Sequence, residues 1–315
     1  MEKRRLGRQG PEITVVGFGA WAAGGPWHFG WGPQNDRESI AAIHRSLDLG
    51  INWIDTAPIY GLGHSEEVVG RALRGRPRES VFVATKCGRI ADGKGIPHGD
   101  LRPETIRSEM EASLERLGLD SVDLYQIHWP DSETGTPLEE SWSALAELQD
   151  EGKTRWIGAS NFDAPLLERC DRIRHVDSLQ PPYSLVRRDV EAEILPWCLR
   201  NGTGVICYSP MQSGLLSGRF DISRLAPDDW RHRSPFFQEP KLSRSLASVE
   251  RLRPLAASRG ASVGRLAVGW VLAHPAVTAA IVGARGPEQA EENAAAAEIR
   301  LTEAERLEVE KAFGR

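Results

Sequence analysis

Four side chains with complementary chemistry stand at, or just beyond, the ends of short apolar runs in the first half of the chain. The run "INWID" ends at Asp55 and is followed by Tyr60, "SVFVATK" ends at Lys86, and "VDLYQIH" ends at His128. A phenol has a pKa of about 10 and is a poor acid at neutral pH, but a neighbouring ammonium lowers that pKa. A carboxylate keeps the lysine charged, and a neutral histidine can donate a hydrogen bond to a carbonyl oxygen. Such a set suits the protonation of an oxygen while a hydride arrives at carbon.

Each of the four residues also has an ordinary structural explanation when it is taken alone. An aspartate after a strand is more often a cap, a lysine is usually solvated, and a histidine is more often a hydrogen-bonded core residue than a catalyst. The functional interpretation therefore depends on all four side chains reaching one place. Enzymes built on parallel barrels do their chemistry at the carboxyl ends of the strands.

Short apolar runs alternate with longer amphipathic ones, and the apolar runs read as strands buried on both faces. We predict strands over 13–19, 51–55, 80–86, 122–128, 154–160, 177–180, 203–210 and 278–284. We predict helices over 36–50 (with Asp36 as its cap), 65–73, 102–118, 137–152, 163–174, 190–202, 244–259, 262–273, 286–297 and 302–313. Eight strand–helix pairs predict an α/β fold: a single (β/α)8 TIM barrel with an N-terminal β-hairpin through "RQGPE" and extra C-terminal helices.

The composition is that of an ordinary globular protein, with 40% hydrophobic and 26% charged residues in 315. We expect one domain over residues 1–315, because no linker or low-complexity segment interrupts the chain. The net charge of −5 argues against a nucleic-acid or anionic-membrane partner. No run approaches about 18 apolar residues, and no apolar segment follows the charged start, so we expect neither a membrane span nor a signal peptide.

The cysteines include no CxxC pair, so they predict neither a zinc ribbon nor a redox motif, and we predict no metal site. We expect buried free thiols in a reducing compartment, which favours a cytoplasmic location. The four are Cys87, Cys170, Cys198 and Cys207.

Two segments match nucleotide-binding motifs only formally. "GFGAWA" (17–22) fits the dinucleotide fingerprint, which should open a helix at once, but here a loop of glycines, prolines and aromatic residues follows. "GKT" (152–154) lacks the glycine that a phosphate loop needs five residues before its Gly-Lys pair, since Glu147 occupies that position. We therefore expect neither motif to bind a nucleotide in that way.

The segments around the four residues resemble a known family. The aldo-keto reductase superfamily has motifs similar to "DTAPIYG", "ATKCG", "YQIHWP" and "YGLGHSEEVVGRAL", and its cofactor segments are similar to "IGASNF", "YSPMQSGLLSG" and "GARGPEQAEENAAA". The resemblance covers essentially the whole chain. Within the superfamily, the chain is similar to the bacterial-type, potassium-channel β-subunit-like branch. It implies that Tyr60 is the general acid toward a substrate carbonyl and that Lys86 tunes it. Asp55 would pair with Lys86, and His128 would position the carbonyl.

The same resemblance implies that NADP(H) binds in an extended pose without a Rossmann fold. Ser160, Asn161 and Gln180 would hold the nicotinamide carboxamide, and Tyr208 would stack on the ring. The residues that would run along the pyrophosphate are Ser209, Met211, Gln212, Ser213, Gly214 and Leu215. The sequence agrees in part, because this stretch offers small residues and backbone N–H groups suited to an anion. A flexible loop would look the same.

The last cofactor segment would cover the adenosine phosphate at a helix N-terminus. The candidates there are Gly283, Arg285, Gln289, Glu292 and Asn293. Many family members carry Lys-Ser at positions 283–284 and arginine at 289. This chain lacks them, so Arg285 remains as the guanidinium for a 2′-phosphate. We favour NADPH, with NADH as the alternative.

The substrate side is predicted to be aromatic. The residues in or beside the first and fourth strand–helix loops are Trp21, Trp27, Trp31 and Trp129. They could form a wall for a sugar ring or an aryl aldehyde, or could simply pack between loops. Segment 211–243, with Trp230, Phe236 and Phe237, could fold over the site. Such loops set specificity in barrels, and we expect a small carbonyl or alcohol substrate; the oligomeric state is not predicted.

Two other functions fit parts of the sequence. Potassium-channel β-subunits of the same superfamily keep the barrel and cofactor but serve a membrane protein as partners. Tight cofactor binding without turnover would indicate such a module. A barrel aldolase would use Lys86 as a Schiff-base nucleophile, and borohydride trapping on Lys86 would reveal it. We predict the first function, an NADPH-dependent oxidoreductase that reduces an aldehyde or ketone.

Overall fold

Eight parallel strands form a closed barrel in the computed structural model, which describes residues 1–314. The strands follow one another around the barrel in chain order, and the last pairs with the first, with Ala280 opposite Val16. They are β3 (Val16–Gly19), β4 (Trp53–Asp55), β5 (Phe82–Cys87), β8 (Val122–Ile127), β9 (Thr154–Ser160), β10 (Ser178–Gln180), β11 (Gly204–Cys207) and β12 (Ala279–Gly283). This arrangement confirms the predicted (β/α)8 barrel.

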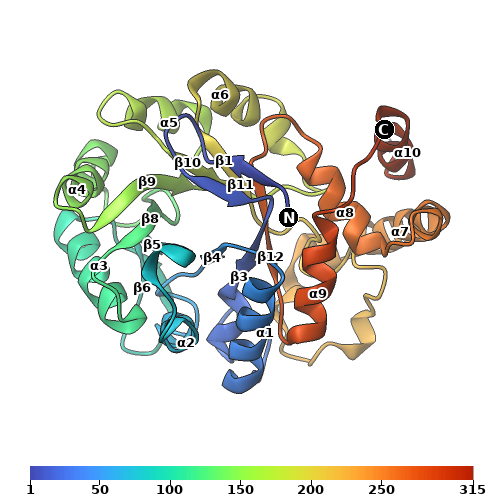
Figure 1. Cartoon of the computed structure of the whole chain (residues 1–315), viewed down its shortest axis with the longest axis horizontal. Coiled ribbons are helices and arrows are strands. Elements are labelled where there is room, and N and C mark those ends of the chain that lie inside the picture. Colours follow the sequence, from blue (N-terminus) through green and yellow to red (C-terminus); the bar gives the residue numbers. More distant parts are fainter. Residues whose placement is uncertain (315) are drawn as a thin grey trace.

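A ring of helices surrounds the strands, which lie at the centre of the view in Figure 1. The helices are α1 (Asp36–Asp48), α2 (His64–Leu73), α3 (Pro103–Leu117), α4 (Leu138–Asp150), α5 (Ala164–Asp171), α6 (Ile194–Asn201), α7 (Lys241–Ser258), α8 (Val263–Leu272), α9 (Pro287–Ala296) and α10 (Glu303–Ala312). The additional C-terminal helix, α10, packs against α7 at the edge of the molecule. Within residues 1–314, no helix combines the length and the apolar character that crossing a membrane requires.

The interior of the barrel is filled by one apolar cluster, to which alternate residues of the strands contribute. Its strand members are Trp53, Phe82, Ala84, Leu124, Ile206, Ala279 and Ile281. Asp55 and Lys86 each lie two residues beyond a member of this cluster, and His128 lies four beyond one. The same two-residue period therefore brings all three toward the barrel axis at the carboxyl ends of the strands.

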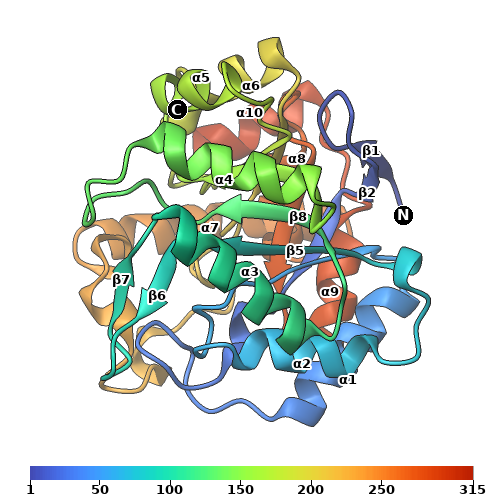
Figure 2. The ribbon, with the colours of Figure 1, turned by 90° about the vertical axis from the view of Figure 1, so that its left-hand side faces the viewer.

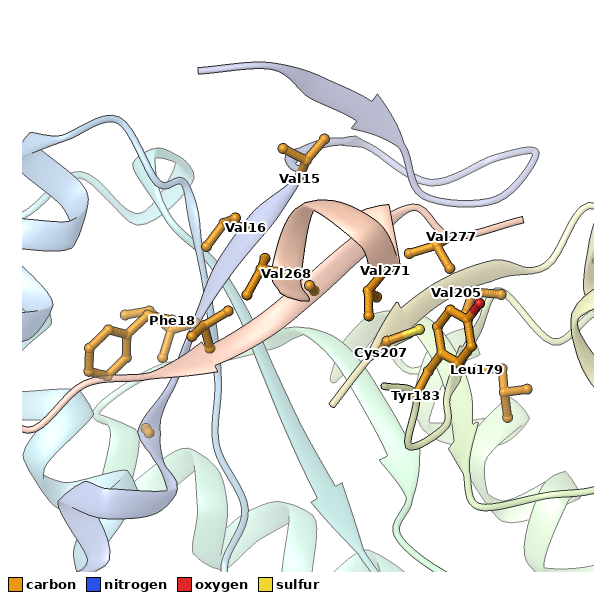
Figure 3. Packing of buried hydrophobic residues seen from close by; sticks show 14 of the residues in the cluster. Val15, Val16, Phe18, Leu179, Tyr183, Val205, Cys207, Val268, Val271 and Val277 are labelled. Atoms are coloured by element: carbon orange, nitrogen blue, oxygen red, sulfur yellow. The ribbon is translucent and has the colours of Figure 1, made fainter. Parts of the chain in front are cut away.

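A second, larger apolar cluster lies between the barrel and the helices. Figure 3 shows Val16 and Phe18 of β3, Cys207 of β11, and Val268 and Val271 of α8 within it. All five are at most 2% exposed. Apolar burial on both faces explains why the strands read as apolar runs without clean alternation.

Two β-hairpins lie at opposite ends of the barrel (Figure 2). The predicted N-terminal hairpin is confirmed: β1 (Lys3–Arg5) pairs with β2 (Glu12–Thr14), and Leu6 and Ile13 join the interior cluster from this side. The second hairpin, β6 (Arg89–Ala91) with β7 (Pro97–Gly99), was not predicted. It follows β5 directly and so stands at the end of the barrel that carries Lys86.

Several predicted boundaries differ from the observed ones. The strand over 13–19 is divided at Val15 between β2 and β3. The cap of α1 is Asn35, whose side chain accepts from the backbone N–H of Arg37, and not Asp36, whose carboxylate is bound by Arg71 and His64 of α2 instead. The remaining elements are short 3-10 turns at Ala20–Gly24, Arg78–Ser80, Asp189–Glu191, Ile222–Arg224, Trp230–Arg233 and Pro235–Phe237. The turn at Asp189–Glu191 lies at the predicted start of the helix over 190–202, and α6 itself begins at Ile194.

The glycines of "GFGAWA" have a packing explanation. A Cβ on Gly17 would lie 2.1 Å from the Trp53 ring, and one on Gly19 would lie 2.7 Å from Ile281. Both glycines therefore make room for the interior cluster. A 3-10 turn follows them, so the helix N-terminus that a dinucleotide fingerprint requires is missing at this point.

Candidate active site

Lys86 is the centre of a buried polar cluster at the carboxyl end of the barrel. Its ammonium lies 2.9 and 2.7 Å from the two carboxylate oxygens of Asp55 and 2.9 Å from the carbonyl oxygen of Thr56. It also lies 3.3 Å from the hydroxyl of Tyr60. Gln180 donates to Asp55 from the other side, at 2.8 Å. The structure thus brings the predicted carboxylate, ammonium and phenol together, with the ammonium within hydrogen-bonding distance of the other two.

The phenol of Tyr60 is more weakly acidic than the sequence suggested. Burial, and secondly the negative charge of Asp55, raise the pKa of Tyr60 well above its ordinary value. The prediction that Lys86 lowers this pKa is wrong for the protein alone. The main reason is burial; the second is that Asp55 binds the ammonium directly, so the phenol faces an ion pair and not a free cation. Tyr60 is consequently protonated at neutral pH.

The pKa values of Lys86 and His128 are both lowered. Burial lowers the pKa of Lys86, although Asp55 opposes this effect. Burial, together with the positive charges of Lys86 and Arg89, holds the pKa of His128 well below its ordinary value. The imidazole is therefore neutral at pH 7, as the predicted chemistry requires. Its ring centroid lies 5.8 Å from that of Tyr60, with the rings nearly perpendicular at 80°.

A cavity of about 390 Å³ opens above this cluster, and its wall is largely aromatic. All four predicted tryptophans line it, together with Phe29 and Trp230; they are Trp21, Trp27, Trp31 and Trp129. Trp21 is the centre of the group, with ring centroids 5.9 Å from Trp31 and 5.8 Å from Trp230. Trp27 lies 6.1 Å from the Tyr60 ring.

The indole N–H groups of this wall are unusual. Four of them are buried without a hydrogen-bond partner among the described residues: those of Trp21, Trp27, Trp31 and Trp230. Buried polar groups normally find partners, and an unpartnered one costs about 1–3 kcal/mol. Four such groups in one cluster favour a ligand-binding wall over simple packing between loops.

Segment 211–243 places one aromatic side chain, that of Trp230, on the cavity wall. Arg231 holds this part of the segment in place, because its guanidinium lies 5.3 Å from the centroid of the Trp31 ring and donates to the Ser213 carbonyl. Asp229 binds the same guanidinium through two hydrogen bonds. Phe236 and Phe237 are not among the described residues that line the cavity. The segment therefore covers the site with one aromatic side chain.

The residues predicted to hold the nicotinamide all line the cavity beside the polar cluster. Asn161 donates to the carbonyl of His128 at 3.0 Å and accepts from the Tyr208 hydroxyl at 2.8 Å. The Ser160 hydroxyl donates to the backbone carbonyl of Gln180. These bonds fix the side chains in one layer, with Tyr208 presenting its ring at the end of β11.

The segment predicted to follow the pyrophosphate has a strained backbone. Five non-glycine residues have positive φ within residues 1–314, and four of them are predicted cofactor residues: Asn161, Ser209, Gln212 and Ser213. Gly214 continues the run with φ of 93°. Each such residue costs roughly 1–3 kcal/mol, and such strain gathers at functional sites. Successive N–H groups in this conformation form a concave anion-binding surface.

Two residues of this segment lie away from the cavity. Gln212 is buried and accepts from Ser184, and Leu215 is fully buried in the outer apolar cluster. Met211, Ser209, Ser213 and Gly214 do line the cavity. Their backbone N–H groups also donate within the segment, that of Gln212 to Ser209 and that of Leu215 to Gln212, so both residues shape the loop instead of facing the cavity.

Of the residues predicted for the adenosine end, one lines the cavity and the others contact neighbouring residues. Gly283 lines the cavity, and Asn293 donates to its carbonyl oxygen. Arg285 is bound to Gln34 at 2.7 Å and to the Pro33 carbonyl, and Gln289 accepts from the backbone N–H of Arg285. Glu292 is paired with Arg265 and Ser262.

Two features of the site were missed in the sequence. Arg89 of β6 lines the cavity, as does Pro97 of β7. Gln34, in the loop after β3, makes reciprocal bonds with Arg285, since its amide nitrogen also donates to the Arg285 carbonyl at 2.9 Å. The available signal for Arg89 was its place in a loop at the carboxyl end of a strand, three residues after Lys86.

Comparisons with known proteins agree with this architecture. The model of the Aldo/keto reductase family matches residues 15–312. The chain is 38% identical to an NADH-specific methylglyoxal reductase of Escherichia coli (strain K12), over 97% of this chain and 96% of that protein. It is also 38% identical to the aldo-keto reductase YhdN of Bacillus subtilis (strain 168), over 92% and 87%.

Among solved structures, a glycerol dehydrogenase from Gluconobacter oxydans superposes with a TM-score of 0.89 and 39% identity, over 99% of this chain and 94% of that one. These matches span nearly the whole barrel, including the segments that build the cavity. Members of this family use nicotinamide cofactors; the branch of the superfamily stays a prediction. The chain belongs to the aldo/keto reductase family and is an oxidoreductase that acts on carbonyl or alcohol groups.

Proposed function

We propose that this protein reduces an aldehyde or ketone with a nicotinamide cofactor, and oxidises the alcohol in reverse, with Tyr60 as the general acid. The observation that carries the proposal is the contact of the Tyr60 hydroxyl with a buried Lys86–Asp55 pair on the floor of an aromatic cavity. A bound reduced nicotinamide supplies the hydride. The residues of the chain must then orient the carbonyl and deliver one proton to its oxygen.

Tyr60 is suited to that delivery because it is protonated at neutral pH and lies at the cavity. The neutral imidazole of His128 donates a hydrogen bond to the carbonyl oxygen and so fixes its direction. As the phenol gives up its proton, negative charge develops on its oxygen. The ammonium of Lys86, 3.3 Å away, stabilises that charge. Asp55 holds Lys86 in place, and Gln180 holds Asp55.

The polar side chains and backbone N–H groups beside the cavity suit a nicotinamide cofactor. We propose that Ser160, Asn161 and Gln180 bind the nicotinamide carboxamide, with Tyr208 against the ring. The strained run at 209–214 would receive the pyrophosphate on the backbone N–H groups of its cavity-lining residues Ser209, Met211, Ser213 and Gly214. The support for this assignment is that strain of this kind is retained where a ligand uses it. Gln289, Glu292 and Asn293 would support the adenosine end through the contacts they make with Arg265, Arg285 and Gly283.

Arg285 supports NADPH as the preferred cofactor. Its guanidinium is bound by an amide and a carbonyl oxygen, both neutral, so no carboxylate within residues 1–314 compensates its positive charge. A 2′-phosphate would compensate that charge. The name of the Escherichia coli relative points instead to NADH, so the two dissociation constants must be measured side by side.

We propose that the substrate is a small carbonyl compound seated against the tryptophan wall. The relatives named for methylglyoxal and for glycerol act on molecules of that size. A cytoplasmic location is supported by the four cysteines, which are buried free thiols.

The test is to mix the purified protein with NADPH, and separately with NADH, against a panel of aldehydes, ketones and reducing sugars. Loss of the absorbance of the reduced nicotinamide measures turnover. We expect turnover with at least one carbonyl class. Tight cofactor binding with turnover at the level of noise would instead favour a cofactor-binding partner subunit.

A further inference from the structure

Arg89 is a charged residue on the cavity wall that the proposed reaction does not use. It lies on β6, and it is the one cationic side chain among the described residues that line the cavity. The other charged lining residue is Asp55, whose carboxylate is already bound by Lys86 and Gln180. The substrate side is otherwise mostly aromatic or aliphatic, with Ile59 and Pro97 beside the tryptophans. A guanidinium in such a wall needs an explanation, because a charge beside apolar groups is costly unless it is paired.

The pairing of Arg89 within the protein is weak. One nitrogen, Nη1, donates to Glu133 Oε1 at 3.1 Å, and that oxygen also accepts from the backbone N–H of Gly99 at 2.8 Å. The Glu133 side chain is 41% exposed, and exposed ion pairs contribute little. Within residues 1–314, the remaining N–H groups of Arg89 have no partner. By contrast, Arg174 binds Asp150 through two nitrogens.

Arg89 also lies close to the place where the carbonyl is proposed to sit. It lines the same cavity as His128, Trp129 and Tyr60. Burial, then Lys86 and lastly Arg89 lower the pKa of His128, so Arg89 and His128 interact electrostatically. A substrate with its carbonyl oxygen at Tyr60 and His128 would therefore place a second group, a few bonds away, within the field of Arg89.

We propose that Arg89 is a specificity-determining residue that binds a carboxylate on the substrate, so that the preferred substrates are carbonyl compounds bearing a carboxylate. The planar fork of an arginine matches a carboxylate in two hydrogen bonds. The aromatic wall would hold the carbon skeleton between the two polar ends. This inference rests on the proposed carbonyl reductase function and assigns its substrate class.

The experiment compares two substrates that differ in charge but share the reacting group: para-carboxybenzaldehyde and its methyl ester. The ratio of kcat/KM for the acid to that for the ester is measured in the wild type and in Arg89→Gln. We expect the wild type to prefer the acid by roughly tenfold or more, as one charged hydrogen bond allows. Arg89→Gln should abolish most of that preference, chiefly through KM. Arg89→Lys should retain part of it.

Glu133→Gln is the matched control. It removes the negative charge to which Arg89 and Gly99 of the hairpin donate but leaves the guanidinium, so the acid-to-ester ratio should not fall. A parallel fall of the ratio in Glu133→Gln and Arg89→Gln would show that Arg89 acts only by tying the hairpin to Glu133, and would overturn the proposal. A wild type without preference for the acid would overturn it as well, while turnover of the ester would leave the reductase function intact.

Binding provides a readout that does not depend on turnover. Quenching of tryptophan fluorescence measures the dissociation constants of the acid and the ester, because the cavity wall contains five tryptophans. If neither compound is reduced, the reductase function fails for this substrate class. The Arg89 assignment is still decided, because the acid should bind the wild type at least tenfold more tightly than it binds Arg89→Gln. Equal binding would refute it.

Discussion

Replacing Lys86 with methionine tests the buried ion pair on which the site is built. Lys86 is fully buried, Asp55 is 3% exposed, and the ammonium makes two of the three hydrogen bonds that the Asp55 carboxylate accepts. Removing one partner of a buried pair costs about 3–5 kcal/mol of unfolding free energy, because the other charge stays buried. With roughly 2.1 cal/mol/K of unfolding entropy per residue, about 4 kcal/mol lowers Tm by about 6 °C in 315 residues.

The assay is urea unfolding and calorimetry of Lys86→Met beside two other variants. The double variant Asp55→Asn/Lys86→Met removes both charges and should be more stable than Lys86→Met by at least about 1 kcal/mol. Lys153→Met is the exposed control, since Lys153 is 34% exposed beside Glu111 and should cost less than about 1 kcal/mol. If Lys86→Met is as stable as Lys153→Met, the account of a charge pair held in the barrel is wrong.

Two further predictions follow from the charges of the fold and of the adenosine end. Burial raises the pKa of Glu109 to about 8 from its ordinary value of 4.5, so the folded protein binds an extra proton between those values and stability falls as pH rises from 4.5 to 8. The loss of unfolding free energy is on the order of 4 kcal/mol and should be absent in Glu109→Gln. Urea unfolding at pH 4.5 and pH 8 measures it, and an equal loss of unfolding free energy in the wild type and in Glu109→Gln would contradict the prediction. Arg285→Ala should weaken NADPH binding by roughly tenfold or more and NADH binding much less, by fluorescence titration; equal losses would refute the phosphate role of Arg285.

The barrel and its polar rim could be predicted from the sequence because both depend on the local periodicity of apolar residues along the chain. Eight apolar runs separated by amphipathic helices define the barrel, and a strand's two-residue period brings Asp55 and Lys86 inward with Trp53 and Ala84. The family resemblance then supplied roles for these residues, and the structure brings them into contact. Order along the chain and parity within strands were enough to find this part of the site.

Other features depend on contacts between distant segments, which no local pattern encodes. The β6–β7 hairpin consists of two three-residue strands within a loop, too short to show alternation, so Arg89 was missed. Trp230 reaches the cavity from a segment without a period. The pKa of Tyr60 was predicted in the wrong direction, because its burial and the pairing of Lys86 with Asp55 are properties of the folded chain.

In the proposed reaction, Tyr60 delivers the proton to the carbonyl oxygen. The most direct measurement is the single-turnover rate of hydride transfer in wild type and in Tyr60→Phe, with the dissociation constant of the cofactor measured in both. General acid catalysis contributes roughly 10²–10⁴-fold, so we expect a loss of that size in Tyr60→Phe with cofactor binding retained. A rate within a few-fold of the wild type, with cofactor bound equally well, would contradict the account.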